Sequence, residues 1–201
     1  PEDKLAHYAD AATDIEYLFP NGWGEMEGVH SRTDFDLGQH QEFSGKNLQY
    51  VDQSDGNKKY IPYVIETSVG CDRSLLAVLC DSYRVENEGD KDTERTVLKM
   101  NPKLSPIKVA VMPLMKKGNL EEVARKVFAT VQEHYKAEYD VAGSIGKRYR
   151  RQDEIGTPYC LTIDYDSLED QALTVRDRDS MKQERIPIEN IVRYLKDKLH
   201  F

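Results

Sequence analysis

Residues 61–79 join an apolar run to side chains that could hold a charged ligand. The run begins IPYVI, which is rich in β-branched and aromatic residues and favours a buried strand. Glu66, Ser68 and Arg73 follow, and a buried strand does not normally end in an acid and a base unless they meet a ligand or each other. The alternative is an ordinary ion pair that stabilises a strand–turn–helix corner.

Gly70 lies between the acid and the base of this corner. A glycine has no Cβ, so the backbone there can approach a bound molecule closely. Beyond it, Leu75, Leu76 and Leu79 recur at helical spacing and predict a helix. The corner is therefore predicted to be a strand, a ligand-facing turn and a helix, in that order.

A basic cluster is the second candidate site. Its members surround Tyr149 and are Lys147, Arg148, Arg150 and Arg151. Such charge beside an aromatic ring suits an RNA phosphate backbone with a base stacked nearby, and Gly143 and Gly146 allow close approach. Because Asp153 and Glu154 follow at once, internal ion pairs or a solvated helix face would also explain the cluster.

Two more arginines, Arg176 and Arg178, alternate with aspartates after a predicted strand. They could reach RNA bases, but the alternating signs fit self-paired surface charge equally well. Glu25 and Glu27 are predicted on one face of a strand, where a metal–nucleotide site or a solvated face would explain them. No histidine lies at a spacing typical of a metal site, so no protein-bound metal is predicted.

The composition is that of an ordinary soluble protein. The 201 residues, 39% hydrophobic and 32% charged, allow one large domain or two small ones. No apolar run approaches the roughly 20 residues that span a bilayer, and no signal peptide opens the sequence. Cys71, Cys80 and Cys160 suggest neither a disulfide framework nor a zinc site, which favours the reducing cytoplasm. The net charge of −8 argues against a nucleic-acid partner, but the local basic cluster outweighs it.

The first half of the chain is predicted to alternate short elements with turns. Apolar residues repeat with a helical period over residues 3–18, and a turn follows at residues 20–22. Residues 23–29 are predicted to form a strand, and residues 44–60 a hairpin with an Asp-Gly turn.

A change in composition separates the two halves. Residues 86–95 are charged and predict a surface loop or mobile segment, and residues 101–106 form a linker with two prolines. We therefore place a domain boundary near residue 103.

The second half alternates strands with helices. Strands are predicted over residues 107–112, 137–141, 159–163, 172–176 and 184–187, and helices over residues 119–135 and 188–199. Such alternation indicates α/β layers around a mostly parallel sheet.

Three stretches of the chain together resemble one family. The sequence IETSVGCDR, residues 65–73, resembles motif 3 of class II aminoacyl-tRNA synthetases in its glycyl-tRNA synthetase form. Two further stretches resemble the same family in the same order: GWGEMEG at residues 22–28 with SRTDFDL at residues 31–37, and GSIGKRYRRQDEIGTP at residues 143–158. The resemblance covers nearly the whole chain.

The resemblance implies an α/β protein in two parts. Residues 1–102 would be the end of an α+β catalytic domain with an antiparallel sheet, and residues 103–201 an α/β anticodon-binding domain with a mixed sheet. Motifs 1 and 2 of the class would lie before Pro1. The chain is therefore expected to be a carboxy-terminal fragment that does not charge tRNA alone and lacks the segment through which the full-length protein forms a homodimer.

The implied reaction has two steps and no membrane partner. Glycine and ATP, the latter complexed with Mg²⁺, give glycyl-adenylate, and the glycyl group then passes to the 3′-terminal adenosine of tRNA(Gly). No protein nucleophile is required, because positioning and charge neutralisation lower the barrier.

The same resemblance assigns roles to individual residues. Glu66 and Ser68 match the positions that hold the glycine ammonium, and Arg32 matches the arginine of the glycine pocket. Arg73, with Gly70 beside it, matches the arginine that holds the ATP phosphates, a task that suits a planar guanidinium.

Further roles follow for Glu25 and for the basic residues. Glu25 matches an acid of the active-site sheet that contacts the substrate or the magnesium nucleotide. The residues expected to contact tRNA are Lys147, Arg148, Arg150, Arg151, Arg176 and Arg178.

Two other interpretations compete with a synthetase. A non-catalytic nucleic-acid-binding relative, such as the accessory subunit of mitochondrial DNA polymerase, is the main alternative. The presence of the glycine- and ATP-site residues together argues against it, because a binding module needs no glycine pocket. The other is an unrelated α/β domain with a chance Glu–Arg corner.

Overall fold

The computed structural model describes residues 5–199. Packing divides the chain into two compact units, Pro1–Cys80 and Asp81–Phe201, and each is described by itself. None of the described helices is both long enough and apolar enough to cross a bilayer. The domain boundary near residue 103 stays a prediction.

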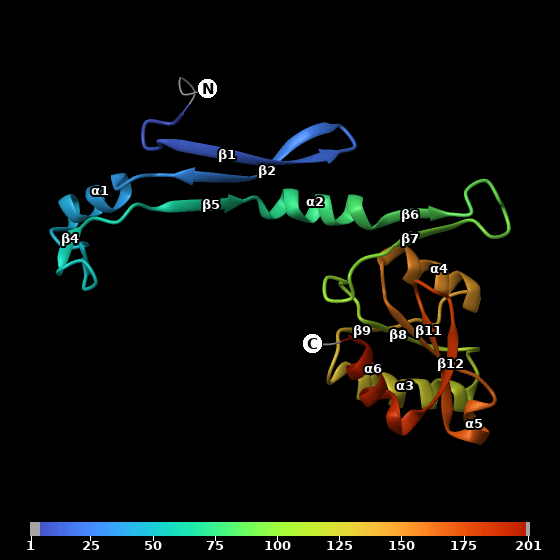
Figure 1. Ribbon diagram of the computed structural model, residues 1–201. Coiled ribbons are helices and arrows are strands. Elements are labelled where there is room, and N and C mark those ends of the chain that lie inside the picture. The colour runs from blue at the N-terminus through green and yellow to red at the C-terminus, as the bar shows by residue number, and fades with distance from the viewer. Residues whose placement is uncertain (1–4, 200–201) are drawn as a thin grey trace. The chain divides into compact units, whose positions relative to one another are not determined.

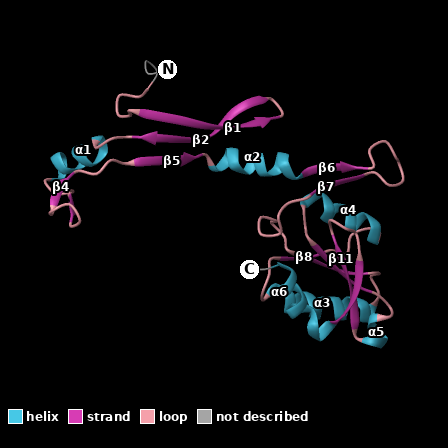
Figure 2. Ribbon diagram, viewed as in Figure 1, coloured by secondary structure: helices cyan, strands magenta, loops and turns pink. Residues whose placement is uncertain are grey.

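The first unit contains a three-stranded antiparallel sheet in the order β1-β2-β5 (Figures 1 and 2). Its strands are β1 (Ala11–Phe19), β2 (Gly22–Ser31) and β5 (Ile65–Val69). Between β2 and β5 lie α1 (Phe35–Ser44) and the predicted hairpin of β3 (Tyr50–Asp52) and β4 (Lys58–Tyr60), and α2 (Cys71–Ser82) follows β5.

The unit begins with a strand where a helix was predicted. β1 pairs along its whole length with β2 and ends with Phe19 opposite Gly22. The prediction of a helix over residues 3–18 is therefore wrong for the residues that the structure describes. Residues 3 and 4 lie outside the described residues. The apolar spacing is ambiguous, and β-branched and aromatic side chains such as Ile15 and Tyr17 favour a ladder when a tight turn supplies the partner strand.

The central strand also differs from the prediction. β5 covers Ile65–Val69, whereas a buried strand was expected over residues 61–65. Pro62 lacks the backbone N–H that a ladder needs, so it does not suit the expected strand. The ladder with β2 starts at Ile65, opposite Ser31, and just before it the backbone of Val64 bonds to Arg32 and Thr33. The strand is also largely exposed, unlike the buried strand that was expected.

The second unit opens with a hairpin of β6 (Tyr83–Glu86) and β7 (Arg95–Leu98). The sequence predicted a surface loop over residues 86–95, which holds for the exposed turn but not for Arg95, whose side chain is only 3% exposed. β7 packs on α4 (Ile145–Ile155). The hairpin was missed because Arg95 owes its burial to partners far away in the sequence.

A five-stranded sheet in the order β12-β11-β10-β8-β9 forms the centre of the second unit. Its strands are β8 (Val109–Pro113), β9 (Ala137–Tyr139), β10 (Tyr159–Ile163), β11 (Ala172–Asp177) and β12 (Gln183–Pro187). β8, β9 and β10 are parallel, and β11 and β12 are antiparallel additions. The mixed sheet is therefore confirmed.

Helices cover both faces of this sheet (Figure 1). α3 (Gly118–Gln132) and α6 (Ile191–Leu199), the latter after a 3-10 turn (Ile188–Asn190), enclose the main core with Val109, Leu161 and Leu173. On the other face, α4 packs on Met112 and Cys160, and the short α5 (Ser167–Asp170) precedes β11. The alternation of elements in the sequence predicted these layers of helix and sheet. It also predicted a mostly parallel sheet, whereas β11 and β12 join the sheet antiparallel.

Gly156 ends α4 in the left-handed conformation, with φ +81°. An alanine Cβ there would lie 3.1 Å from the carbonyl oxygen of Leu98. We expect Gly156→Ala to lower the free energy of unfolding of the second unit by about 1–2 kcal/mol. Gly146→Ala is the matched control, because it lies within the same helix with open space around it and should be neutral or stabilising. Urea denaturation followed by circular dichroism measures both, and equal stabilities would contradict the prediction.

Candidate nucleic-acid interface and ligand site

Arg32 joins two acids at one end of the sheet of the first unit. Its guanidinium donates to both carboxylate oxygens of Asp36 at 2.6 and 2.9 Å and to Glu66 at 2.7 Å, and it lies 4.0 Å above the ring of Tyr8. The hydrogen bonds from Arg32 hold the pKa of Asp36 below its usual range. The structure thus brings Arg32 and Glu66 together in an ion pair, and the glycine pocket stays a prediction. Asp36 was missed, although its i,i+4 spacing from Arg32 was a usable signal.

The strand register places further polar groups beside this pair. His30 lies opposite Glu66 and Gly28 opposite Ser68, so these four residues share one face of the sheet. A Cβ on Gly28 would lie 2.6 Å from the His30 ring, so the imidazole occupies that space. The face therefore offers a carboxylate and a hydroxyl, which are groups that can accept hydrogen bonds from an ammonium.

A bulge in β2 corrects the prediction for the two acids of that strand. Ile15 pairs with Glu27 and the next residue, Glu16, pairs with Glu25, so Met26 is an extra residue. Glu25 and Glu27 consequently face opposite sides of the sheet rather than one side. A bulge cannot be inferred from alternation, since alternation assumes a regular register.

Arg73 and Glu25 meet, but through the backbone. The guanidinium of Arg73 donates to the carbonyl oxygen of Glu25, and the Glu25 residue is exposed. At Gly70 a Cβ would make only an ordinary contact, 3.8 Å from Arg73, so space alone does not require this glycine. The predicted ATP-site residues therefore gather at the end of β5 that leads into α2.

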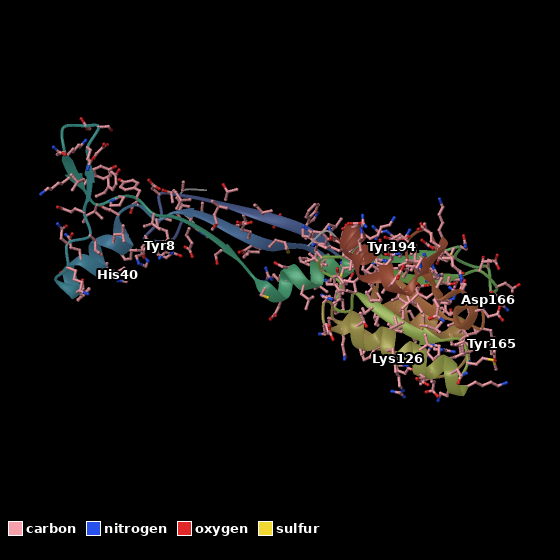
Figure 3. All side chains as sticks on the ribbon, turned by 90° about the horizontal axis from the view of Figure 1, so that it is seen from below. Tyr8, His40, Lys126, Tyr165, Asp166 and Tyr194 are labelled. Carbon is pink, nitrogen blue, oxygen red and sulfur yellow. The ribbon has the colours of Figure 1, made fainter. Side chains whose placement is uncertain are left out.

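The second candidate site is a hollow at the carboxyl ends of β8 and β9. Its volume is about 400 Å³ and it is lined by Leu114, Met115, Lys116, Val141, Gly143, Ser144 and Arg148. α3 follows β8 on one face of the sheet and α4 follows β9 on the other, and the hollow lies between the segments that lead into these two helices. Ligands of open α/β sheets usually bind outside the carboxyl ends of the strands. Tyr165, labelled in Figure 3, donates to the sulfur of Met115 at 3.3 Å.

The basic cluster lies on α4, which begins at this hollow. Lys147 and Arg151 are exposed, and Arg150 is half-buried. Arg151 also pairs with Asp140 at 2.6 Å and donates to the carbonyl of Ala142 at the same distance. Three positive charges on one helix are suited to bind phosphate groups.

Arg148 has a different environment from its neighbours. It is 3% exposed and donates to the carbonyl oxygens of Pro113 at 2.6 Å and Leu114 at 3.1 Å. Burial lowers its pKa. Arg148 thus anchors α4 to the end of β8, and direct contact with RNA is not supported for it.

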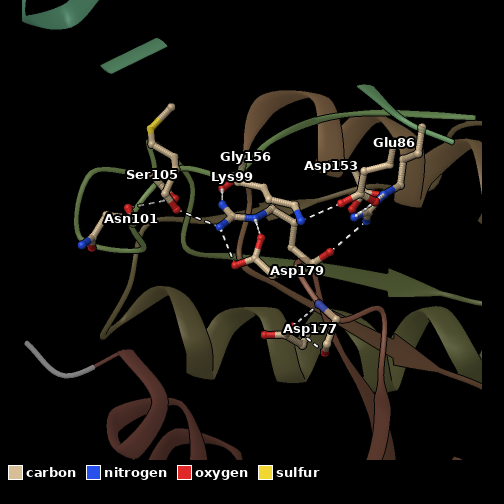
Figure 4. A network of polar contacts seen from close by, with 12 residues as sticks. Glu86, Lys99, Asn101, Ser105, Asp153, Gly156, Asp177 and Asp179 are labelled. Atoms are coloured by element: carbon tan, nitrogen blue, oxygen red, sulfur yellow. Dashed lines mark hydrogen bonds and ion pairs between the residues drawn. The ribbon is translucent and has the colours of Figure 1, made fainter. Parts of the chain in front are cut away.

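Arg176 and Arg178 are buried as well, and Figure 4 shows the polar network around Asp153 and Gly156, with which they form hydrogen bonds. Arg176 forms two hydrogen bonds with Asp153, at 2.8 and 3.0 Å, and lies 4.8 Å from the centre of the Tyr149 ring. Arg178 donates to the carbonyl oxygens of Gly156 and Met100, at 2.7 and 2.8 Å. The geometry gives both arginines a structural role. Arg178 pairs with its neighbour Asp179 at 2.8 Å, as the self-paired alternative expected, but Arg176 pairs with Asp153 of α4, and neither arginine is surface charge.

Asp153 is the centre of this network. Its carboxylate also accepts from Arg95 at 3.2 Å, and Arg95 pairs with Glu86 at 2.7 Å. The sequence suggested Asp153 as an internal partner of the α4 arginines, but its partners come from β7 and β11. Arg95 was not recognised, because 58 residues separate it from Asp153. Among the described residues, no cluster of acids, histidines and cysteines could hold a metal ion.

Comparison with known proteins shows which proteins this chain is similar to. The family model "Anticodon binding domain" matches residues 108–198. The chain is 53% identical to the glycine–tRNA ligase of Treponema denticola over 201 residues, which is 98% of this chain and 45% of that protein. It is 56% identical to the glycine–tRNA ligase of Alkaliphilus oremlandii, over 100% of this chain and 42% of that protein. It is 55% identical to the glycine–tRNA ligase of Chlorobaculum tepidum, over 98% of this chain and 41% of that protein. The chain spans less than half the length of these relatives.

Proposed function

We propose that this chain, which is homologous along its whole length to the glycine–tRNA ligases, reads tRNA(Gly) through its second unit as part of a glycine–tRNA ligase. The observation that carries the proposal is the hollow at the carboxyl ends of β8 and β9, which is bordered by a basic helix and lies within the match to the anticodon-binding family. An anticodon base would enter the hollow, and phosphates would contact Lys147, Arg150 and Arg151. Arg148, Arg176 and Arg178 would act by positioning α4 and β11.

The first unit would supply part of the site for glycine and ATP. Glu66 and Ser68 would hold the glycine ammonium, with Arg32 fixing the carboxylate of Glu66 in place. Support comes from their common face and from the 2.7 Å ion pair between Arg32 and Glu66. The crowding of Gly28 by His30 would help to exclude substrates that carry a β-carbon.

Arg73 would neutralise charge on the ATP phosphates, and Glu25 would contact the substrate or its Mg²⁺. Their meeting at the end of β5, beside Gly70, supports this assignment. The full-length protein would act as a cytoplasmic homodimer, and the three free cysteines of the chain suit a reducing compartment.

The proposal is tested by binding of this chain to tRNA(Gly) and to the same tRNA with an altered anticodon. We expect binding to weaken by about tenfold or more when the anticodon changes, because each base stacked on or held by the protein contributes about 1–3 kcal/mol. Fluorescence anisotropy with end-labelled tRNA measures both affinities. Equal affinities would show that the domain does not read the anticodon.

A further inference from the structure

A second hollow lies at the amino ends of β8 and β9, opposite the hollow at their carboxyl ends. Its volume is about 580 Å³, and it is lined by Lys108, His134, Tyr135, Lys136, Val192 and Lys196. Lys108 and Lys136 directly precede β8 and β9, and the backbone N–H of Lys108 donates to the carbonyl of Lys136 at 2.8 Å. Parallel strands start at the same edge, so this hollow is separate from the one at their carboxyl ends.

The hollow concentrates positive charge in a chain of net charge −8. Lys136 and Lys196 are exposed, and neither forms an ion pair with any residue that the structure describes. Lys108 is partly buried, and its ammonium donates to the carbonyls of Pro102 and Lys103 at 2.7 and 2.8 Å. No acid is among the described lining residues, although burial and the nearby charge of Asp197 raise the pKa of the Tyr135 hydroxyl.

Interaction with a helix dipole explains the position of only one of these three lysines. Lys196 lies in the last turn of α6, where a cation stabilises the negative end of the helix. Lys108 and Lys136 instead precede strands, and the last turn of α3 contains no basic residue. The two carbonyl partners of Lys108 account for its ammonium, so the presence of Lys136 beside Lys196 at one hollow is what needs another explanation.

We propose that this hollow binds a phosphate group, with Lys136 and Lys196 as the groups that contact its oxygens. Lys108 adds positive charge from behind, and His134 and Tyr135 offer hydrogen bonds at the rim. The phosphate belongs either to an RNA backbone or to a free phosphate, and the chemistry of recognition is the same. The proposal does not depend on anticodon reading, since it concerns the opposite edge of the sheet.

The test is a titration of the full chain with inorganic phosphate at constant ionic strength, followed through the NMR signals of lysine side chains. We expect shifts at Lys136 and Lys196 that saturate, and at least about tenfold weaker binding in Lys136→Gln/Lys196→Gln. Lys126→Gln is the control: this lysine is on α3, 73% exposed, and lies outside the lining of the hollow (Figure 3). Circular dichroism checks that each variant is folded.

A second titration measures binding of a single-stranded RNA, a hexamer of uridylate. Weaker binding of both phosphate and hexamer by the double variant identifies an RNA backbone as the source, and weaker binding of phosphate alone identifies free phosphate. If the double variant binds both probes as the unchanged chain does, the proposal is wrong. Alanine substitution of Lys147, Arg150 and Arg151 should leave phosphate binding at this hollow unchanged, which separates this proposal from the function proposed above.

Discussion

Asp153→Ala is expected to destabilise the second unit by about 3–5 kcal/mol, the cost typical of removing one partner from a buried ion pair. Asp153 is 1% exposed and accepts hydrogen bonds from Arg176 and Arg95, which are themselves buried. Without the carboxylate, two guanidinium groups remain in the interior with too few acceptors. Arg95 would keep Glu86, whereas Arg176 has no other ion pair among the described residues.

Hydrogen exchange measured by mass spectrometry can follow this loss, because peptides from β10 and β11 report on the second unit alone. Glu154→Gln is the matched control, since Glu154 is the exposed neighbour of Asp153 and should change stability by less than about 0.5 kcal/mol. Protection of β10 and β11 that is equal in both variants would mean that the network adds little to stability. Asp153→Asn keeps the shape of the side chain, so its loss of stability should lie between the losses of Asp153→Ala and Glu154→Gln.

Replacing Lys147, Arg150 and Arg151 together with alanine is expected to weaken tRNA binding roughly tenfold or more at low salt, and to lower its salt dependence. Each phosphate contact contributes about 0.7–0.9 to the slope of log affinity against log salt, so three lost contacts should reduce that slope by about 2 to 3. Anisotropy titrations at four salt concentrations would give the slope directly.

A control with the same change in charge is needed, because removing any three positive charges weakens binding to RNA in general. Lys103, Lys126 and Arg193 are exposed and lie outside α4 and the hollow beside it. Their replacement by alanine should change the slope much less. If both triple variants lose the same slope, the cluster on α4 is a solvated surface and the contacts lie elsewhere.

The second unit was largely predictable from the sequence, because its elements are amphipathic and bury one face. The strand of residues 159–163 was predicted with the bounds that β10 has, and α3 and α6 begin within a few residues of their predictions. The first unit was harder. Its strand β1 is largely exposed, so its sequence carries no alternation between core and solvent, and the helical spacing of the apolar residues there is coincidental.

The sites were predictable to the extent that their residues are near in sequence or belong to a known motif. Arg32 and Glu66 were identified by resemblance, and the structure joins them. Charge density alone could not separate the exposed Lys147 from the buried Arg148, because that depends on which side of α4 meets the sheet. The partners of Arg176 were also hidden, since Asp153 is 23 residues away.

The burial of Arg95 also limits how this domain could be exchanged between proteins in evolution. A recombination joint in the linker at residues 101–106 would separate Arg95 and Val97 from the helix α4 that they cover, and would leave Asp153 with Arg176 alone. A recombination joint ahead of β6 would transfer Arg95 and Val97 together with α4, Asp153 and Arg176. The segment inherited as one piece should therefore begin well before residue 108, where the match to the anticodon-binding family starts.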